Sequence, residues 1–291
     1  MTESNPSGKG ILSIANHDCD ATGMTYVYPV VSRRAGGVSI GINLNPNNAC
    51  NWHCAYCQVP GLARGSAPEI DIPLLSEELE SLLDVIIHGN YMQEHVPEGC
   101  RRIVDVAISG NGEPTSSRQF DQVVACIVAR LRKAGLLDRI QIVLITNGSY
   151  VHRPEVLRGL DLMSKHRGRV WFKLDAGTDA AIQLINGVSL SVARQMQQLQ
   201  AAAMHCPTWI QTCLFAWDGV EPAEVDIAAY SAFLNKALLQ GVRLQGILLY
   251  GLARPSLQAE SVHVSKLSES SMQAVAGRIQ SDTGLLVKLS P

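Results

Sequence analysis

The sequence predicts an α/β protein built around one mainly parallel sheet. Apolar runs with strand character alternate six times with segments of helical period, and no Gly/Ser-rich linker separates these units. Unusual polar residues and cysteines follow the first four runs, which is where parallel sheets place their ligands. The pattern fits both a doubly wound open sheet and a full or partial (β/α) barrel.

The elements follow one another regularly along the chain. Residues 39–44 predict the first strand, and the apolar spacing after Ser76 predicts an amphipathic helix with Ser76 as its N-cap. The later strands are expected at 103–108, 140–145, 170–175, 209–215 and 244–250, with helices over 120–131, from Pro154, over 189–204 and from near Pro222. From Ser256 we expect one or two helices and a last short apolar run at 285–289.

Composition describes a globular protein with no strong charge bias. The chain has 291 residues, 46% of them hydrophobic, and a formal net charge of −2, which excludes collagen, coiled coil and wholesale disorder. No window reaches the ~18–20 apolar residues that cross a bilayer, so we expect a cytoplasmic protein without membrane contact. A nucleic-acid partner would need a local basic patch.

Three of the eight cysteines, Cys50, Cys54 and Cys57, lie within eight residues in a C-x3-C-x2-C pattern. Clustered thiols of this kind indicate metal or redox chemistry rather than a framework of disulfides. Three thiolates can bind three irons of a 4Fe-4S cluster and leave the fourth iron open for chemistry. A zinc loop, which needs a fourth ligand, and an inert group of buried thiols are the alternatives.

The cysteine segment CNWHCAYC resembles the cluster loop of radical S-adenosylmethionine (radical SAM) enzymes, in which an aromatic residue precedes the last cysteine. GNGEPT, at the end of the second predicted strand, is similar to the motif that contacts the methionine amino group in that superfamily. The resemblance extends from about Arg33 to Pro255 through ITNG, KLDA and LARP. It is strongest with the small iron-sulfur oxidoreductases related to wyosine-type tRNA enzymes.

The resemblance implies a fold and a division of the chain. We expect a parallel (β/α)6 partial barrel, TIM-like, with the cysteine loop after its first strand. The expected domains are an N-terminal extension over 1–36, the radical SAM barrel over 37–255, and a C-terminal helical extension over 256–291 that packs on the barrel.

The resemblance also implies a set of site residues and partners. A 4Fe-4S cluster is expected on Cys50, Cys54 and Cys57, and contacts to S-adenosylmethionine from Tyr56, Gly112, Glu113, Asn147 and Asp175. A one-electron donor such as flavodoxin or ferredoxin is expected to reduce the cluster, which cleaves S-adenosylmethionine to a 5′-deoxyadenosyl radical that takes hydrogen from a substrate. That substrate is a small molecule or nucleoside, or a base in tRNA; a non-catalytic zinc or iron-sulfur protein is the alternative of another class.

Two basic residues are candidates for substrate binding. Strand alternation puts Lys173 on the same face as Asp175, and Arg254 follows the sixth predicted strand. If that face lines a barrel, Lys173 and Arg254 can bind an anionic group of the substrate. A buried Lys173–Asp175 ion pair and a solvated Arg254 are the plainer interpretations.

Overall fold

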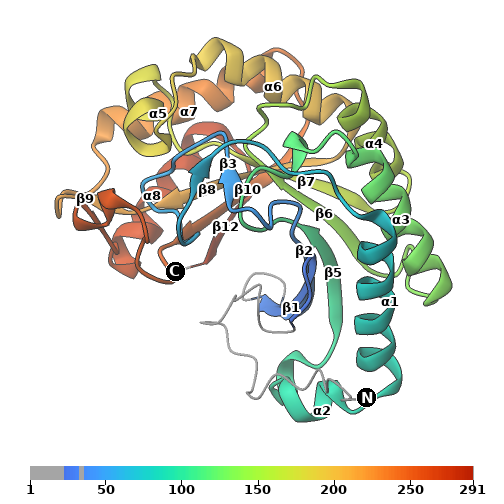
Figure 1. Ribbon diagram of the computed structural model, residues 1–291. Helices are drawn as coiled ribbons and strands as arrows, with labels where there is room; N and C mark the ends of the chain where they lie inside the picture. Colours follow the sequence, from blue (N-terminus) through green and yellow to red (C-terminus); the bar gives the residue numbers. More distant parts are fainter. Residues whose placement is uncertain (1–22, 33–35, 291) are drawn as a thin grey trace.

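An eight-stranded curved sheet forms the centre of the molecule (Figure 1). The computed structural model describes residues 23–32 and 36–290, so most of the expected N-terminal extension, 1–36, lies outside the described residues. The strand order is β1-β2-β5-β6-β7-β8-β10-β12. Every neighbouring pair is parallel except β1 and β2, which are antiparallel.

The strands of this sheet are β1 (Val27–Ser32), β2 (Gly37–Ile42), β5 (Ile103–Ile108), β6 (Gln141–Thr146), β7 (Gly168–Lys173), β8 (Thr208–Leu214), β10 (Leu244–Gly251) and β12 (Val287–Ser290). The helices are α1 (Ile72–His88), α2 (Tyr91–His95), α3 (Phe120–Lys133), α4 (Pro154–Ser164), α5 (Asp179–Asn186), α6 (Val192–His205), α7 (Glu224–Leu239) and α8 (Glu269–Thr283). Two small ladders pair β3 (Ala49–Cys50) with β4 (Ala63–Arg64) and β9 (Ala216–Trp217) with β11 (Val264–Ser265).

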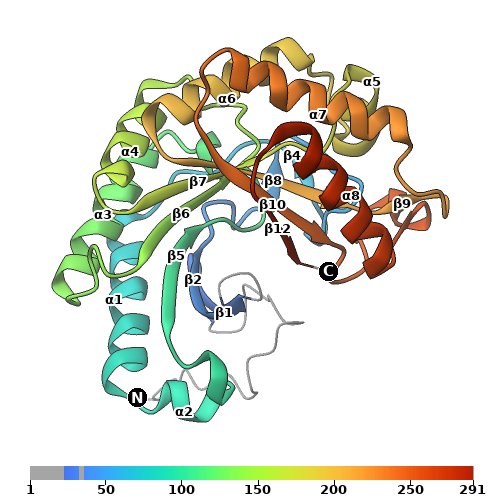
Figure 2. The ribbon, with the colours of Figure 1, turned by 180° about the vertical axis from the view of Figure 1, so that it is seen from behind.

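The sheet curls so that helices α1, α3, α4, α6 and α7 cover its convex side (Figures 1 and 2). β1 and β12 are the two ends of the strand order and do not pair with each other, so the barrel is partial. The expected α/β partial barrel with six parallel β/α units is therefore confirmed. A doubly wound sheet, with helices on both faces, does not describe this arrangement.

The first helix begins earlier than the sequence pattern indicates. α1 begins at Ile72, and the Asp71 carboxylate accepts a hydrogen bond from the Leu74 backbone N–H at 3.0 Å, so the N-cap is Asp71 and not Ser76. The apolar periodicity begins only one turn later because the first turn of the helix is half-exposed. Glu78 of this helix is buried and accepts hydrogen bonds from the backbone before and within β1.

The sheet continues on both sides of residues 37–255. β1 lies before residue 37 and pairs along its whole length with β2, and β12 lies after residue 255 and pairs with β10. α8 packs against α7 and β12. The domain bounds at 37 and 255 therefore do not coincide with the edges of the sheet.

No helix among the described residues is long and apolar enough to cross a membrane.

Candidate active site

The cysteine loop leaves β2, crosses the open end of the barrel toward β8 and β10, and returns to α1 (Figure 1). The end of α5 holds its middle: the backbone N–H groups of His53 and Ala55 donate to the carbonyls of Asn186 and Ile185 at 3.0 and 2.8 Å. The Arg64 guanidinium donates to the Asn51 carbonyl at 2.7 Å. These contacts fix a loop that has almost no regular secondary structure of its own.

A second set of contacts holds the end of the loop. The Cys57 carbonyl accepts from the Leu257 backbone N–H at 2.9 Å, the Ser256 hydroxyl at 3.1 Å and the Gln258 amide at 3.3 Å. The Gln58 amide in turn donates to the Arg254 carbonyl at 2.9 Å. The segment after β10 is thus attached to the last cysteine of the motif.

Hydrogen-bond donors surround the three thiols. The Trp52 backbone N–H lies 3.5 Å from Cys50 Sγ, and the Asn186 amide lies 3.4 Å from Cys54 Sγ. Burial raises the pKa of Cys50 to about 11 and that of Cys54 to about 12, and Lys173 lowers both in part. N–H donors and a nearby cation favour the thiolate form, which is the form that binds an iron-sulfur cluster.

The three thiols of the loop can supply one ligand to each of three irons of a cluster. In the part of the chain that the structure describes, no group of three or more His, Cys, Asp or Glu side chains converges to hold one metal ion, as a tetrahedral zinc site demands. Asn186 Oδ1 beside Cys54 is also buried without a partner among the described residues, which leaves one polar atom for a ligand.

The turn after β5 packs directly against the cysteine loop. A Cβ on Gly112 would collide with the Ala49 carbonyl oxygen and the Asn45 side chain, so only glycine allows this approach. Gly112 therefore brings backbone close to the strand that carries Cys50. This contact is with the chain's own backbone, and a contact with S-adenosylmethionine stays a prediction.

The Glu113 carboxylate is buried and accepts hydrogen bonds from four groups of the protein. Its oxygens accept from the backbone N–H and hydroxyl of Thr115, the hydroxyl of Thr146 and the backbone N–H of Asn147, the last at 2.7 Å. Burial raises the pKa of Glu113, and these hydrogen bonds oppose the rise. Glu113 therefore joins the ends of β5 and β6.

Asn147 and Asp175 also contact the cysteine loop. The Asn147 amide donates to Asn51 Oδ1 at 3.0 Å, and Asp175 Oδ2 accepts from the Tyr56 hydroxyl at 2.5 Å and from the Asn186 amide at 2.8 Å. The three predicted carboxylate and amide groups thus gather at this loop. These residues are not among those that line the large cavity, and their direct contact with S-adenosylmethionine stays a prediction.

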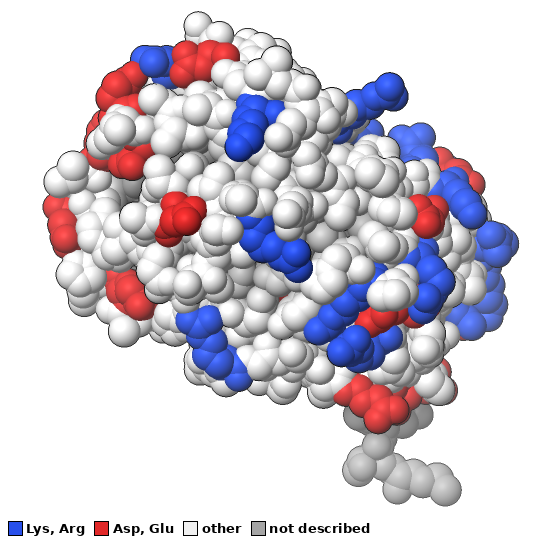
Figure 3. All heavy atoms as spheres, turned by 90° about the horizontal axis from the view of Figure 1, so that it is seen from above, with Lys and Arg blue, Asp and Glu red and all other residues white. Residues whose placement is uncertain are grey.

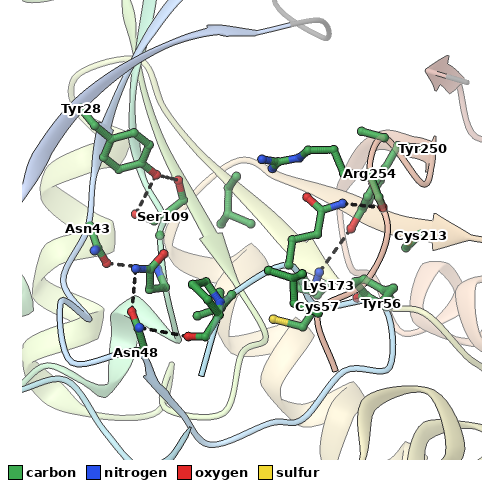
Figure 4. Close-up of a pocket in the computed structure, with 18 of the residues that line it drawn as sticks. Tyr28, Asn43, Asn48, Tyr56, Cys57, Ser109, Lys173, Cys213, Tyr250 and Arg254 are labelled. Atoms are coloured by element: carbon green, nitrogen blue, oxygen red, sulfur yellow. Dashed lines mark hydrogen bonds between the residues drawn. The ribbon is translucent and has the colours of Figure 1, made fainter. Parts of the chain in front are cut away.

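The cavity of about 1000 Å³ opens on the concave side of the sheet (Figure 4). Tyr56, Cys57, Lys173 and Arg254 line it, which brings both substrate candidates and part of the cysteine motif to one space. In Figure 4 Asn43, Asn48, Ser109 and Tyr28 stand on the opposite side. A neutral polar wall therefore faces a cationic wall.

Lys173 is a buried cation in this cavity. Its Nζ lies 3.4 Å from the Tyr250 hydroxyl and 4.8 Å from the centroid of the Tyr56 ring. Burial lowers the pKa of Lys173, but Tyr250 and Asp175 outweigh this effect and raise it. No Lys173–Asp175 ion pair forms, because Asp175 instead accepts from Tyr56, Asn186 and the Cys213 backbone.

Charge is unevenly distributed on the outer face. Figure 3 shows Lys and Arg gathered on its right, the side of α3 and α4 in Figure 1, with Asp and Glu mostly along the left margin. On these elements, Arg158 of α4 pairs with Asp121 of α3, and Arg118, just before α3, pairs with Glu155 of α4. The near-neutral chain therefore carries a local basic area.

Sequence reasoning missed several groups that complete the site. Asn186, Ser256 and Gln258 hold the loop from 130 to 200 residues away along the chain, and Gln211 lines the cavity. No local sequence signal identifies Asn186, Ser256 or Gln258 as site residues. Gln211 carries one signal, because it is a polar residue within an apolar strand. Cys213 also lines the cavity, whereas Cys206 is in the main core.

We expect Glu113→Gln to lower the free energy of unfolding by about 2–3 kcal/mol, because an amide N–H₂ would face N–H and O–H donors and leave buried groups unpaired. Urea unfolding measures the loss. The exposed Glu77→Gln in α1 is the control, with a change within about 0.5 kcal/mol. Equal losses in the two variants would contradict the structural role of Glu113.

Comparison with solved structures identifies the fold. A radical SAM methyltransferase from Sphaerobacter thermophilus aligns with a TM-score of 0.61 at 11% identity, covering 90% of this chain and 68% of that one. TYW1 with a lysine-pyruvate adduct bound aligns with a TM-score of 0.56 at 16% identity, covering 86% and 74%. Streptococcus suis SuiB bound to S-adenosylmethionine aligns with a TM-score of 0.53 at 10% identity, covering 88% and 47%. The chain has the fold of radical SAM enzymes.

Sequence comparison adds little to this result. No family model matches the chain. A curated protein described as GTPase Obg, from Brachyspira hyodysenteriae, is 25% identical over 158 residues, and the match spans 54% of this chain but only 20% of that protein. This sequence contains no G-x-x-x-x-G-K-[ST] phosphate loop.

Proposed function

We propose that this chain is a radical SAM enzyme that binds a 4Fe-4S cluster through Cys50, Cys54 and Cys57. The observation that carries the proposal is a C-x3-C-x2-C loop held across the open end of a radical SAM fold, with its last cysteine lining a cavity of about 1000 Å³. When bound and reduced, such a cluster supplies the electron that cleaves S-adenosylmethionine to methionine and a 5′-deoxyadenosyl radical.

The protein's own residues position the loop and shape the cavity. Asp175 and Asn186 hold Tyr56 and Cys54, while Glu113 and Asn147 join the strand ends to Asn51. We infer that Tyr56 and the backbone at Gly112 contact S-adenosylmethionine, and that Glu113, Asn147 and Asp175 act mainly by fixing the surfaces that bind it. Rigid support of this kind holds reacting groups in a productive geometry.

The substrate occupies the rest of the cavity in this proposal. The Lys173 ammonium and Arg254 give one wall a positive charge, which favours an anionic small molecule or nucleoside.

A base in tRNA is the second candidate substrate, favoured by the basic area on the side of α3 and α4 (Figure 3) and by the likeness to TYW1. A soluble one-electron carrier such as flavodoxin or ferredoxin is the proposed reductant for either substrate.

Anaerobic reconstitution with iron and sulfide tests the proposal. We expect about four irons per chain, and 5′-deoxyadenosine after addition of S-adenosylmethionine and a low-potential reductant. A reconstituted protein that carries the cluster but forms no 5′-deoxyadenosine would be a non-catalytic iron-sulfur protein. One that binds a single zinc instead would refute the cluster assignment.

A further inference from the structure

Three arginines lie at the end of the barrel where the cysteine loop is also found. Arg118 lies just before α3, Arg153 is the N-cap residue of α4, and Arg194 belongs to the first turn of α6. Each of these helices leads back to the start of a parallel strand, so its N-terminus lies where the strands end. α4 packs against both α3 and α6. We call the three residues the arginine rim.

The rim has a positive field that Glu155 does not cancel. The Arg118 guanidinium pairs with Glu155 at 3.2 Å, yet burial and Arg118 together lower the pKa of Arg153 although Glu155 opposes them. Burial lowers the pKa of His152, and Arg194 and Arg153 lower it further. The guanidinium groups of Arg153 and Arg194 donate to neutral oxygens. Like charges gathered in this way favour an anionic partner.

The loop after β6 joins the rim to the cysteine loop. The Asn147 amide donates to Asn51 Oδ1 at 3.0 Å, and the Trp52 indole N–H donates to the Ser149 hydroxyl at 3.1 Å. Arg153 follows in the same loop after β6, immediately before α4. None of these residues lines the large cavity, which reaches the cysteine loop only at its last part. The rim and the cavity therefore approach different parts of the cysteine loop.

We propose that the arginine rim is the docking surface for an acidic protein that delivers one electron to the cluster. The rate of electron transfer falls steeply with distance, so the carrier has to dock beside the cysteine loop while the cavity stays free for S-adenosylmethionine and substrate. Interfaces of this kind are small and transient, and complementary charge sets their association rate.

The step itself moves one electron from the reduced carrier to the oxidised cluster, and no bond forms or breaks in it. The proposal rests on the proposed function in placing the cluster on the cysteine loop. It adds the surface and the charge by which this chain recognises its reductant.

A nucleic acid is the other anionic partner that the rim could attract. The reacting base of an RNA substrate has to enter the cavity, and none of the rim arginines lines it. The position of the rim therefore favours the carrier, and RNA binding becomes an outcome of the test.

The first test measures binding of a fluorescently labelled flavodoxin of net negative charge to the reconstituted protein. Arg118→Gln with Arg194→Gln removes two charges from the rim. It leaves Arg153, whose guanidinium donates to the Ser116 carbonyl. At low ionic strength we expect fluorescence anisotropy to show a Kd raised by roughly fivefold, and high ionic strength should reduce the difference.

Lys165→Gln with Arg243→Gln is the matched control. Both side chains are exposed, but Lys165 ends α4 and Arg243 precedes β10, so they lie at the opposite end of the barrel. The control loses the same charge as the rim variant and is expected to keep the affinity of the unmodified protein within about twofold.

The second test compares two reductants on the same preparations. Reduced methyl viologen is a small cation that needs no docking surface, so the rim variant should form 5′-deoxyadenosine with it at the unmodified rate. With limiting reduced flavodoxin, the rate of the rim variant should fall by roughly fivefold and that of the control should not.

An unchanged affinity of the rim variant for flavodoxin, or equal weakening in the rim variant and the control, would overturn the proposal. Loss of binding to a tRNA transcript with unchanged flavodoxin binding would overturn it too and assign the rim to RNA. Absence of 5′-deoxyadenosine from the unmodified protein with both reductants would instead overturn the proposed function. Because flavodoxin binding is measured without S-adenosylmethionine, the two failures can be told apart.

Discussion

Replacement of Cys50, Cys54 and Cys57 by alanine is expected to abolish cluster binding while leaving the chain folded. The three thiols lie on a loop whose position depends on other groups: backbone hydrogen bonds to the end of α5 and contacts of the segment after β10 with the Cys57 carbonyl. Alanine keeps all of these backbone groups. Iron and sulfide analysis and visible absorption measure the cluster, and far-ultraviolet circular dichroism measures the fold.

A double variant, Cys100→Ala with Cys126→Ala, is the matched control for that experiment. Both thiols are half-buried and packed against the main core, away from the cysteine loop, so the variant is expected to bind the full complement of iron. If the triple variant still bound about four irons per chain and cleaved S-adenosylmethionine, the ligand assignment would be wrong. Loss of iron in the control would place a ligand outside the loop.

The second large effect is expected for Arg254→Ala, which should lower substrate turnover by ~10²-fold or more. That is the size of the loss when one charged contact of ~3 kcal/mol is removed from the transition state. The Arg254 side chain extends into the cavity in Figure 4, whereas its carbonyl accepts from Gln58. Alanine keeps that carbonyl, so the attachment of this segment to the cysteine loop should survive.

Two rates measured on the same preparation test this assignment. We expect 5′-deoxyadenosine formation without substrate to stay within a few-fold of the unmodified rate, and turnover of a metabolite extract that supports the unmodified enzyme to collapse. Arg139→Ala, at an exposed turn before β6, is the control and should change neither rate. Equal loss of both rates in Arg254→Ala would place Arg254 in the cofactor site, and loss of neither would make it a solvated residue.

The strands and the order of the motifs could be predicted because their signals are local. β5 has the predicted bounds, 103–108, and the other predicted strands of the sheet differ from the observed ones by one to two residues at most of their ends. The start of α1 was missed because its first turn is half-exposed and its cap, Asp71, precedes the apolar periodicity. Apolar periodicity shows which face of a helix is buried, but the helix itself can begin before the first residue of that apolar pattern.

The contacts of the site residues could not be predicted from their spacing. The spacing of Asp175 did not reveal that its carboxylate accepts from Tyr56, 119 residues earlier in the chain, and from Asn186. Strand alternation placed Lys173 and Asp175 on one face. Which partner each finds there depends on the loop that closes over that face.

The sequence by itself determined the alternation of strands and helices, the three clustered thiols and the presence of polar groups at the ends of the parallel strands. Only the tertiary structure decided that the sheet curls into a partial barrel, that Ser256 and Gln258 hold the Cys57 carbonyl, and that Gln211 of β8 lines the cavity. β8 is buried along its whole length, so its apolar pattern does not distinguish the two faces of the sheet. Apolar periodicity and residue spacing are properties of a few adjacent residues. The contacts in the site join groups that lie far apart in the chain, and they exist only once the sheet has formed and brought these groups together.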